Sequence, residues 1–255
     1  MSIVKHNIPI LEHDPNPISL LMPDQEHKGL QLPEKAVFAF LGDAVKHYAE
    51  SHHAVIADQF ISISKAYPFY LLETDGEQIC LVEAPVGAPA ATAVMDCLIG
   101  CGVRKILSCG SCGVLVPMEE NAFLIPKKAL RDEGTSYHYL PPDRFVDVSE
   151  QARKAIEKTL RDRGLPYTEV VTWTTDGYFR ETAEMVSYRR SEGCSVVEME
   201  CAALAACAQF RGVVWGQLLY TADTLADAEH YDERGWGMDS IDLALDLCVE
   251  AVKHF

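Results

Sequence analysis

The sequence predicts an α/β protein in which helices cover both faces of a mostly parallel sheet. Short apolar segments alternate with helical patterns from residue 36 to the end of the chain. The apolar segments show little polar alternation, which is typical of strands covered on both faces. The middle of the chain contains no linker, repeat or low-complexity tract, and 255 residues suit a single large domain.

Residues 1–35 are polar and carry five prolines, so we expect an irregular N-terminal arm before a domain at residues 36–255. The first half of that domain alternates apolar runs with breaker residues. An Asp75-Gly76 turn between two apolar runs indicates a hairpin, and Gly100-Cys101-Gly102 ends a helix with almost no charge. The predicted elements are a strand at 36–41, a helix at 44–51, hairpin strands at 69–72 and 79–82, and a buried helix at 89–100.

The second half continues the alternation of strands and helices. Ser149 precedes an amphipathic pattern that Gly164 closes, as expected of a helix N-cap and C-terminus. The predicted elements are strands at 105–109, 122–125, 168–172, 195–197 and 213–220 and helices at 149–163, 201–210 and 238–255.

Composition excludes several classes of function. The chain has 22 Lys and Arg against 38 Asp and Glu, a net charge of −16. A nucleic-acid binder needs a basic footprint, and an anionic membrane surface repels such a chain, so we expect neither partner. No apolar run approaches the ~18 residues of a membrane span. No signal-peptide pattern starts the chain, and its nine cysteines are odd in number, so we expect free thiols in the cytoplasm. A lone Cys109-Gly-Ser-Cys112 is a weak metal signal, and we predict no metal.

Ligands of open α/β sheets bind beyond the carboxyl ends of the strands. Polar residues therefore matter most where they follow a predicted strand. Four such segments occur: Gly42-Asp43, Gly110-Ser111-Cys112-Gly113, Glu198-Met199-Glu200 and Thr221-Ala222-Asp223.

Glu198 and Glu200 stand among small and apolar residues, where carboxylates need hydrogen-bond partners. They fit an acidic helix N-terminus, a glycosidase pair, or a clamp in which a carboxylate accepts both hydroxyls of a vicinal diol. Asp223 fits either a turn residue or a general acid whose pKa is raised by burial. The glycine-rich segment at Gly110 to Gly113 fits an anion site, although such segments are more often plain turns.

These segments resemble those of the purine-nucleoside and uridine phosphorylase family, over nearly the whole chain from His27 onward. Residues 197–203 are close to the family's Val-Glu-Met-Glu-Ala-Ala signature, and residues 110–113 match the Gly-Ser-Cys-Gly of bacterial purine enzymes. Pro85-Val-Gly-Ala-Pro89 resembles a Gly-Met-Gly-x-Pro turn, and His27-Lys-Gly-Leu30 resembles a segment near the start of the uridine enzymes.

The resemblance implies a single three-layer α/β/α domain around a mixed, partly closed sheet. It implies reversible phosphorolysis of a nucleoside to a free base and ribose 1-phosphate. Inorganic phosphate would be the co-substrate, and no metal or organic cofactor would be needed. It also implies a homo-oligomer, a dimer or a trimer of dimers, whose active site is shared across the dimer interface.

The resemblance also assigns roles, carried over position by position. The acid that protonates the base would be Asp223. The ribose contacts would be Glu198, Met199, Glu200 and a His27 that reaches into the neighbouring subunit. The phosphate contacts would be Gly42, Lys46, Lys65 and Ser111. The contacts to the base and the adjoining sugar would be Tyr178, Val86 and Arg234.

The chain departs from the family at the phosphate site. The three arginines of the family fall at Lys46, Lys65 and Ser108, so two cations are lysines and one is absent. Lysine binds phosphate without the two-pronged geometry of arginine. The resemblance as a whole predicts a purine nucleoside phosphorylase. The altered phosphate site leaves three alternatives open: a uridine phosphorylase, a hydrolytic nucleosidase of the same fold, and a non-catalytic nucleoside-binding protein. Asp223 favours purines, because the only Gln-x-Arg that precedes Glu198-Met199-Glu200, at Gln151, lies too far upstream to read uracil.

Overall fold

A ten-stranded mixed sheet runs through the computed structural model, which describes residues 3–227 and 229–255. Strand β10 pairs with both β5 and β6, so β5, β9, β8, β6 and β10 close into a barrel-like ring. Strands β1, β4, β3 and β2 extend the sheet from β5 as an open wing, and β7 pairs with β6. The mixed, partly closed sheet implied by the resemblance is confirmed.

The elements follow one another along the chain with short connections. The strands are β1 (Lys35–Ala39), β2 (Val55–Ile61), β3 (Ala66–Thr74), β4 (Glu77–Glu83), β5 (Lys105–Val114), β6 (Phe123–Asp132), β7 (Phe145–Asp147), β8 (Tyr167–Thr175), β9 (Val196–Glu198) and β10 (Val214–Thr224). The helices are α1 (Asp43–Ser51), α2 (Ala88–Gly100), α3 (Glu150–Asp162), α4 (Ala183–Ser191), α5 (Cys201–Arg211) and α6 (Ile241–Ala251).

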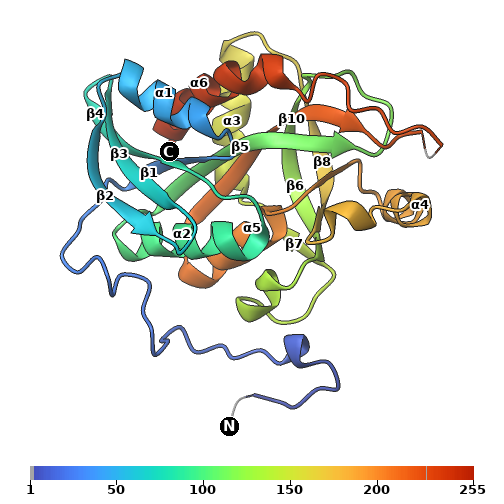
Figure 1. The fold of residues 1–255 in the computed structure, drawn as a ribbon, viewed down its shortest axis with the longest axis horizontal. Coiled ribbons are helices and arrows are strands. Elements are labelled where there is room, and N and C mark those ends of the chain that lie inside the picture. The colour runs from blue at the N-terminus through green and yellow to red at the C-terminus, as the bar shows by residue number, and fades with distance from the viewer. Residues whose placement is uncertain (1–2, 228) are drawn as a thin grey trace.

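Helices cover both faces of the sheet and make three layers (Figure 1). Helices α1, α3 and α6 lie on one face, and α2 and α5 lie on the other. Side chains alternate between the two cores along each strand: Val37 and Leu107 pack toward α6, whereas Phe38 and Ile106 pack toward α2 and α5. The predicted three-layer α/β/α architecture is confirmed.

Several strands are longer than predicted, and in β5 and β10 the extra length changes the setting of a motif. Strand β5 continues from Cys109 to Val114, so Gly110 to Gly113 lies within a strand and not in a turn after it. Strand β10 continues to Thr224, so Asp223 also lies within a strand. The two extensions pair with each other, because β5 and β10 remain adjacent strands past Cys109, where the barrel closes.

Three elements were not predicted: β2, β7 and α4. Most residues of β2 are exposed, so it lacks the pattern of a half-buried strand, and β7 has only three residues. Helix α4 begins at Thr182, whose hydroxyl accepts a hydrogen bond from the Met185 N–H. The predicted C-terminal helix at 238–255 is also shorter, because 3-10 turns at Met238–Ser240 and Val252–His254 flank α6.

The described part of the N-terminal arm, residues 3–34, contains only one short 3-10 helix, Pro9–Leu11. The arm is tied to the domain where the Arg211 guanidinium donates to the Pro17 carbonyl while pairing with Asp96. All nine cysteines are buried free thiols. Cys109 and Cys112 are three residues apart on one strand and pack in different cores, so they cannot share one metal ion. No helix in the described residues has the length and apolarity to cross a bilayer.

Gly216 generates a prediction about how α3 packs on β10. A Cβ at Gly216 would lie 2.5 Å from the Ala152 Cβ, which real contacts do not allow. We expect Gly216→Ala to lower the free energy of unfolding by about 1–3 kcal/mol, the usual effect of overpacking. Urea denaturation measures this, and adding Ala152→Gly should recover part of the loss. A double variant as unstable as the sum of the two single variants would contradict this packing.

Candidate active site

A cavity of about 180 Å³ opens where β5, β9 and β10 end. It gathers predicted residues from five separate segments of the chain. Its lining includes Val86, Ser111, Tyr178, Glu198, Met199, Glu200 and Asp223. It also includes residues that the sequence did not single out for function, among them Phe40, Glu181, Gln217 and Trp236. The predicted acid and most of the predicted sugar and base contacts therefore meet at one place.

Glu198 holds this part of the fold together. One carboxylate oxygen accepts hydrogen bonds from the Thr172 and Thr174 hydroxyls on β8, at 3.1 and 2.6 Å. The other accepts from the backbone N–H groups of Glu200 and Cys201 at the start of α5, at 2.7 and 2.6 Å. Burial raises the pKa of Glu198, and these hydrogen bonds act against that rise. Both oxygens are engaged, so Glu198 fixes the positions of its neighbours. This role matches the acidic helix N-terminus, one of the alternatives given above for Glu198 and Glu200.

Glu200 is the carboxyl group that this arrangement presents to the cavity. It occupies the N-cap position of α5 and is only 6% exposed. One of its oxygens accepts a hydrogen bond from the Gly87 N–H, before α2. Burial, followed by the neighbouring Glu198 charge, raises the pKa of Glu200 to about 8. A pKa near this value favours the protonated form of Glu200 at neutral pH.

Asp223 approaches from β10 and is 7% exposed. Burial raises the pKa of Asp223, while a hydrogen bond from the Tyr231 hydroxyl and the Arg234 charge partly offset this rise. Gly113 on the adjoining strand leaves space for the carboxyl, because a Cβ there would lie 3.2 Å from the Asp223 Oδ1. A buried carboxyl with a raised pKa is suited to donate a proton.

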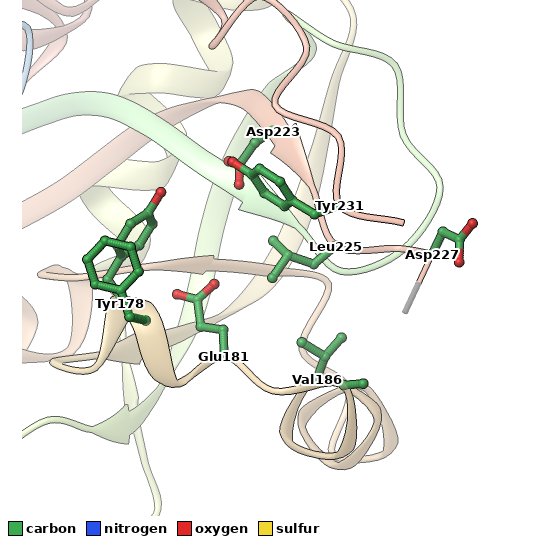
Figure 2. A pocket seen from close by; sticks show the side chains of 9 residues that line it. Tyr178, Glu181, Val186, Asp223, Leu225, Asp227 and Tyr231 are labelled. Carbon is green, nitrogen blue, oxygen red and sulfur yellow. The ribbon is translucent and has the colours of Figure 1, made fainter. Parts of the chain in front are cut away.

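A second cavity of about 370 Å³ adjoins the first and shares Tyr178, Glu181 and Asp223 with it. Figure 2 shows Glu181 and Asp223 pointing into the same space, with Tyr178 and Tyr231 at its sides. Burial and the Asp223 charge raise the pKa of Glu181 to about 7. No sequence motif identifies Glu181, because it stands next to the Thr182 cap and resembles an ordinary acidic residue at a helix start.

The predicted phosphate contacts are separated in this chain. Ser111 lines the cavity, but Gly42, Lys46 and Lys65 do not. Lys46 is exposed on α1 with its Nζ 3.8 Å from Glu50, and Lys65 pairs with Glu83 at 2.5 Å in the loop between β2 and β3. Gly42 is exposed at the start of α1 with a φ of 54°.

Ser108, where the resemblance places a third cation, lies in the core. It is fully buried, and its hydroxyl accepts a hydrogen bond from the Trp215 indole N–H at 3.0 Å. In the described chain, residues 3–227 and 229–255, no Lys or Arg lines the cavity, whereas Glu181, Glu198, Glu200 and Asp223 do. Those residues also contain no cluster of three or more His, Cys, Asp or Glu that could hold a metal ion.

His27 and Arg234 also lie outside the 180 Å³ cavity. The His27 Nδ1 lies 2.9 Å from the Asp58 carboxylate on β2 of the same chain, and the ring packs against Phe69. The Arg234 guanidinium donates to the carbonyls of Met118 and Ala222, at 2.8 and 3.4 Å. Arg234 thus braces the loop beyond β10 and contributes to the site only through its effect on the Asp223 pKa.

Comparison with known proteins agrees with this fold. The family model described as the phosphorylase superfamily matches residues 34–252. The chain belongs to this superfamily. It is 25% identical to the guanosine phosphorylase of Halorubrum lacusprofundi over 165 residues, which cover 63% of this chain and 67% of that protein.

Solved structures share the fold at lower identity. The uridine phosphorylase of Vibrio fischeri ES114 superposes with a TM-score of 0.73 at 20% identity, covering 92% of this chain and 95% of that chain. The AMP nucleosidase of Bacteroides thetaiotaomicron superposes with a TM-score of 0.68 at 22% identity, covering 87% and 88%. Phosphorylases and a nucleosidase thus stand together among the similar proteins, and the superfamily match places this chain among nucleoside phosphorylases and nucleosidases.

The raised pKa values predict how stability depends on pH. A carboxyl whose folded pKa lies above its unfolded value of 4.5 leaves the folded state holding more protons, so stability falls as pH rises through the folded pKa. For Glu181 and Glu200 the decline runs from about pH 4.5 to pH 8. We expect thermal denaturation between pH 5 and 8.5 to show a smaller decline in Tm for Glu200→Gln than for the unmodified chain. Parallel curves for the two proteins would argue against a raised Glu200 pKa.

Proposed function

We propose that the chain breaks the N-glycosidic bond of a purine ribonucleoside, with inorganic phosphate as the acceptor. One observation carries this: two buried carboxyl groups with raised pKa values, Glu200 and Asp223, line the same small cavity from different elements. They suit the two ends of a nucleoside, because a sugar offers hydroxyl donors and a departing base needs a proton.

The chemistry follows from where these groups lie. Glu200 accepts the 2′- and 3′-hydroxyls of ribose, Met199 packs beside the sugar, and Tyr178 stacks on the base. Asp223, whose pKa is raised by burial, donates a proton to N7 of the purine as the C1′–N bond breaks. A positioned acid of this kind contributes typically about 10²–10⁴-fold. The positive charge that develops on the sugar is stabilised by the approaching phosphate, which then forms the bond to C1′.

Purine rather than uracil is supported by Asp223, which can protonate a ring nitrogen, and by the similarity to a guanosine phosphorylase. Phosphate is supported by Ser111 at the exposed side of the cavity and by the guanosine and uridine phosphorylases among the relatives. We further propose a cytoplasmic homo-oligomer, a dimer or a trimer of dimers. In that assembly Lys65 and His27 of each chain would serve the neighbouring site.

Hydrolysis is the second candidate, and the lining of the cavity favours it. Several carboxyl groups face the space where a doubly charged phosphate would bind. In the described residues no Lys or Arg side chain lines this space to balance them. The position that could supply a cation from β5 is the buried Ser108. Water in place of phosphate would meet no such repulsion, because it carries no charge.

One assay separates the candidates. Inosine, adenosine, guanosine and uridine are each incubated with the protein, with and without inorganic phosphate, and free base and ribose 1-phosphate are measured. We expect purine release that depends on phosphate and yields ribose 1-phosphate. Equal release without phosphate would replace phosphorolysis by hydrolysis, and no release from any nucleoside would leave only a binding role.

Two substitutions test the roles of the carboxyl groups. Asp223→Asn keeps the shape but removes the acidic proton, so we expect kcat on a purine nucleoside to fall by about 10²-fold or more with little change in KM. Glu200→Ala should weaken ribonucleosides more than 2′-deoxyribonucleosides, because only the former offer both hydroxyls. Unchanged turnover in Asp223→Asn would remove this residue from the mechanism, and equal losses on both sugars would rule out the diol contact.

A further inference from the structure

A buried amide in the floor of the 180 Å³ cavity has no role in the arrangement described so far. Gln217 is only 1% exposed, yet it lines the cavity. Its Oε1 has no hydrogen-bond partner among the residues that the structure describes. Leaving a buried polar group unsatisfied destabilises a fold by about 1–3 kcal/mol, so such a group in a cavity indicates that a bound molecule supplies its partner.

The position of Gln217 in the fold indicates which part of the substrate supplies this hydrogen-bond partner. Gln217 lies opposite Ser108 in the pairing of β5 with β10, and it lines the cavity together with Gly110. Asp223 stands six residues further along the same strand, roughly 20 Å of extended chain at about 3.3 Å per residue. The two side chains therefore mark opposite ends of the cavity, with Glu200 reaching in from α5.

In displacement at a sugar carbon, the nucleophile arrives on the face opposite to the leaving group. The base leaves toward Asp223, so the nucleophile comes from the end of the cavity that contains Gln217. We propose that the Gln217 side-chain amide hydrogen-bonds the attacking oxygen and is thereby a further catalytic residue. This inference rests on the proposed function, because it takes Asp223 as the acid at the leaving-group end.

An amide suits this task because it has both a donor and an acceptor and no charge. Its N–H group can donate to a phosphate oxygen, and its carbonyl can accept the proton of hydrogenphosphate or of water. In the reaction, an oxygen lone pair forms the bond to C1′, the electrons of the C1′–N bond pass to the base, and the Asp223 proton goes to N7. When water is the nucleophile, its proton is released to solvent, and the Asp223 carboxylate takes up a proton from solvent once the base has left.

The test compares Gln217→Met and Gln217→Glu with the unmodified protein. Thr159→Val is the matched control, because the Thr159 hydroxyl on α3 is also fully buried and unpartnered but lies outside the cavity. The measurements are kcat, the KM for phosphate, the KM for the nucleoside, the phosphate-free rate and Tm.

For phosphorolysis we expect Gln217→Met to raise the phosphate KM or lower kcat by about 10- to 100-fold with the nucleoside KM unchanged. Gln217→Glu should have a larger effect on the phosphate KM, because it adds a charge that repels phosphate. For hydrolysis, the phosphate-free kcat of Gln217→Met falls by a similar factor. Tm of Gln217→Met should hold or rise, as in Thr159→Val, because an unsatisfied buried atom has been removed.

Wild-type kinetics in folded Gln217→Met and Gln217→Glu would overturn the inference and leave the proposed function intact. A fall in Tm with unchanged kinetics would do the same, since it shows a structural role. An unmodified protein that cleaves no nucleoside under either condition would instead overturn the proposed function, and the role of Gln217 with it.

Discussion

The buried Glu198 carboxylate is the interaction on which the rest of the site depends. It joins two threonines of β8 to the first backbone N–H groups of α5, and so determines where that helix begins. A carboxylate can remain in such a place only if its oxygens are satisfied, and the amino end of a helix offers both hydrogen-bond donors and a favourable dipole. Since Glu200 is the N-cap of the same helix, the position of the group proposed to bind sugar follows from the contacts of Glu198.

Much of the fold could be predicted from apolar runs and breaker residues, because strands covered on both faces are nearly continuous in hydrophobicity. The failures have physical reasons. Strand β2 is largely exposed and, among the residues that the structure describes, pairs only with β3, so burial leaves no pattern on it. The segment from Gly110 to Gly113 resembles a turn by composition, but pairing with β10 keeps it extended. Helix α4 carries a local start signal in its Thr182 N-cap, but its mixed composition gives no clear helical periodicity.

The site was predictable where a motif fixes both residue type and position, as at Glu200 and Asp223. The positions of the cationic side chains could not be predicted, because a match in sequence does not say where a flexible side chain ends. The side chains of Lys46 and Lys65 point to acidic partners outside the cavity. Glu181 and Gln217 carry no motif at all. Gln217 gains significance from its burial, from an Oε1 without a partner in the described residues and from its place in the cavity lining, and these are properties of the folded chain.

The raised pKa of Glu200 has a thermodynamic consequence for ligand recognition. Without ligand, burial keeps this carboxyl mostly neutral near pH 7. A diol that donates two hydroxyls favours the ionised form, so sugar binding would expel a proton into the surrounding buffer. The heat of complex formation would then vary with the ionisation enthalpy of the buffer, and affinity would increase toward alkaline conditions. Sugar recognition as proposed here would then exchange a proton for a substrate.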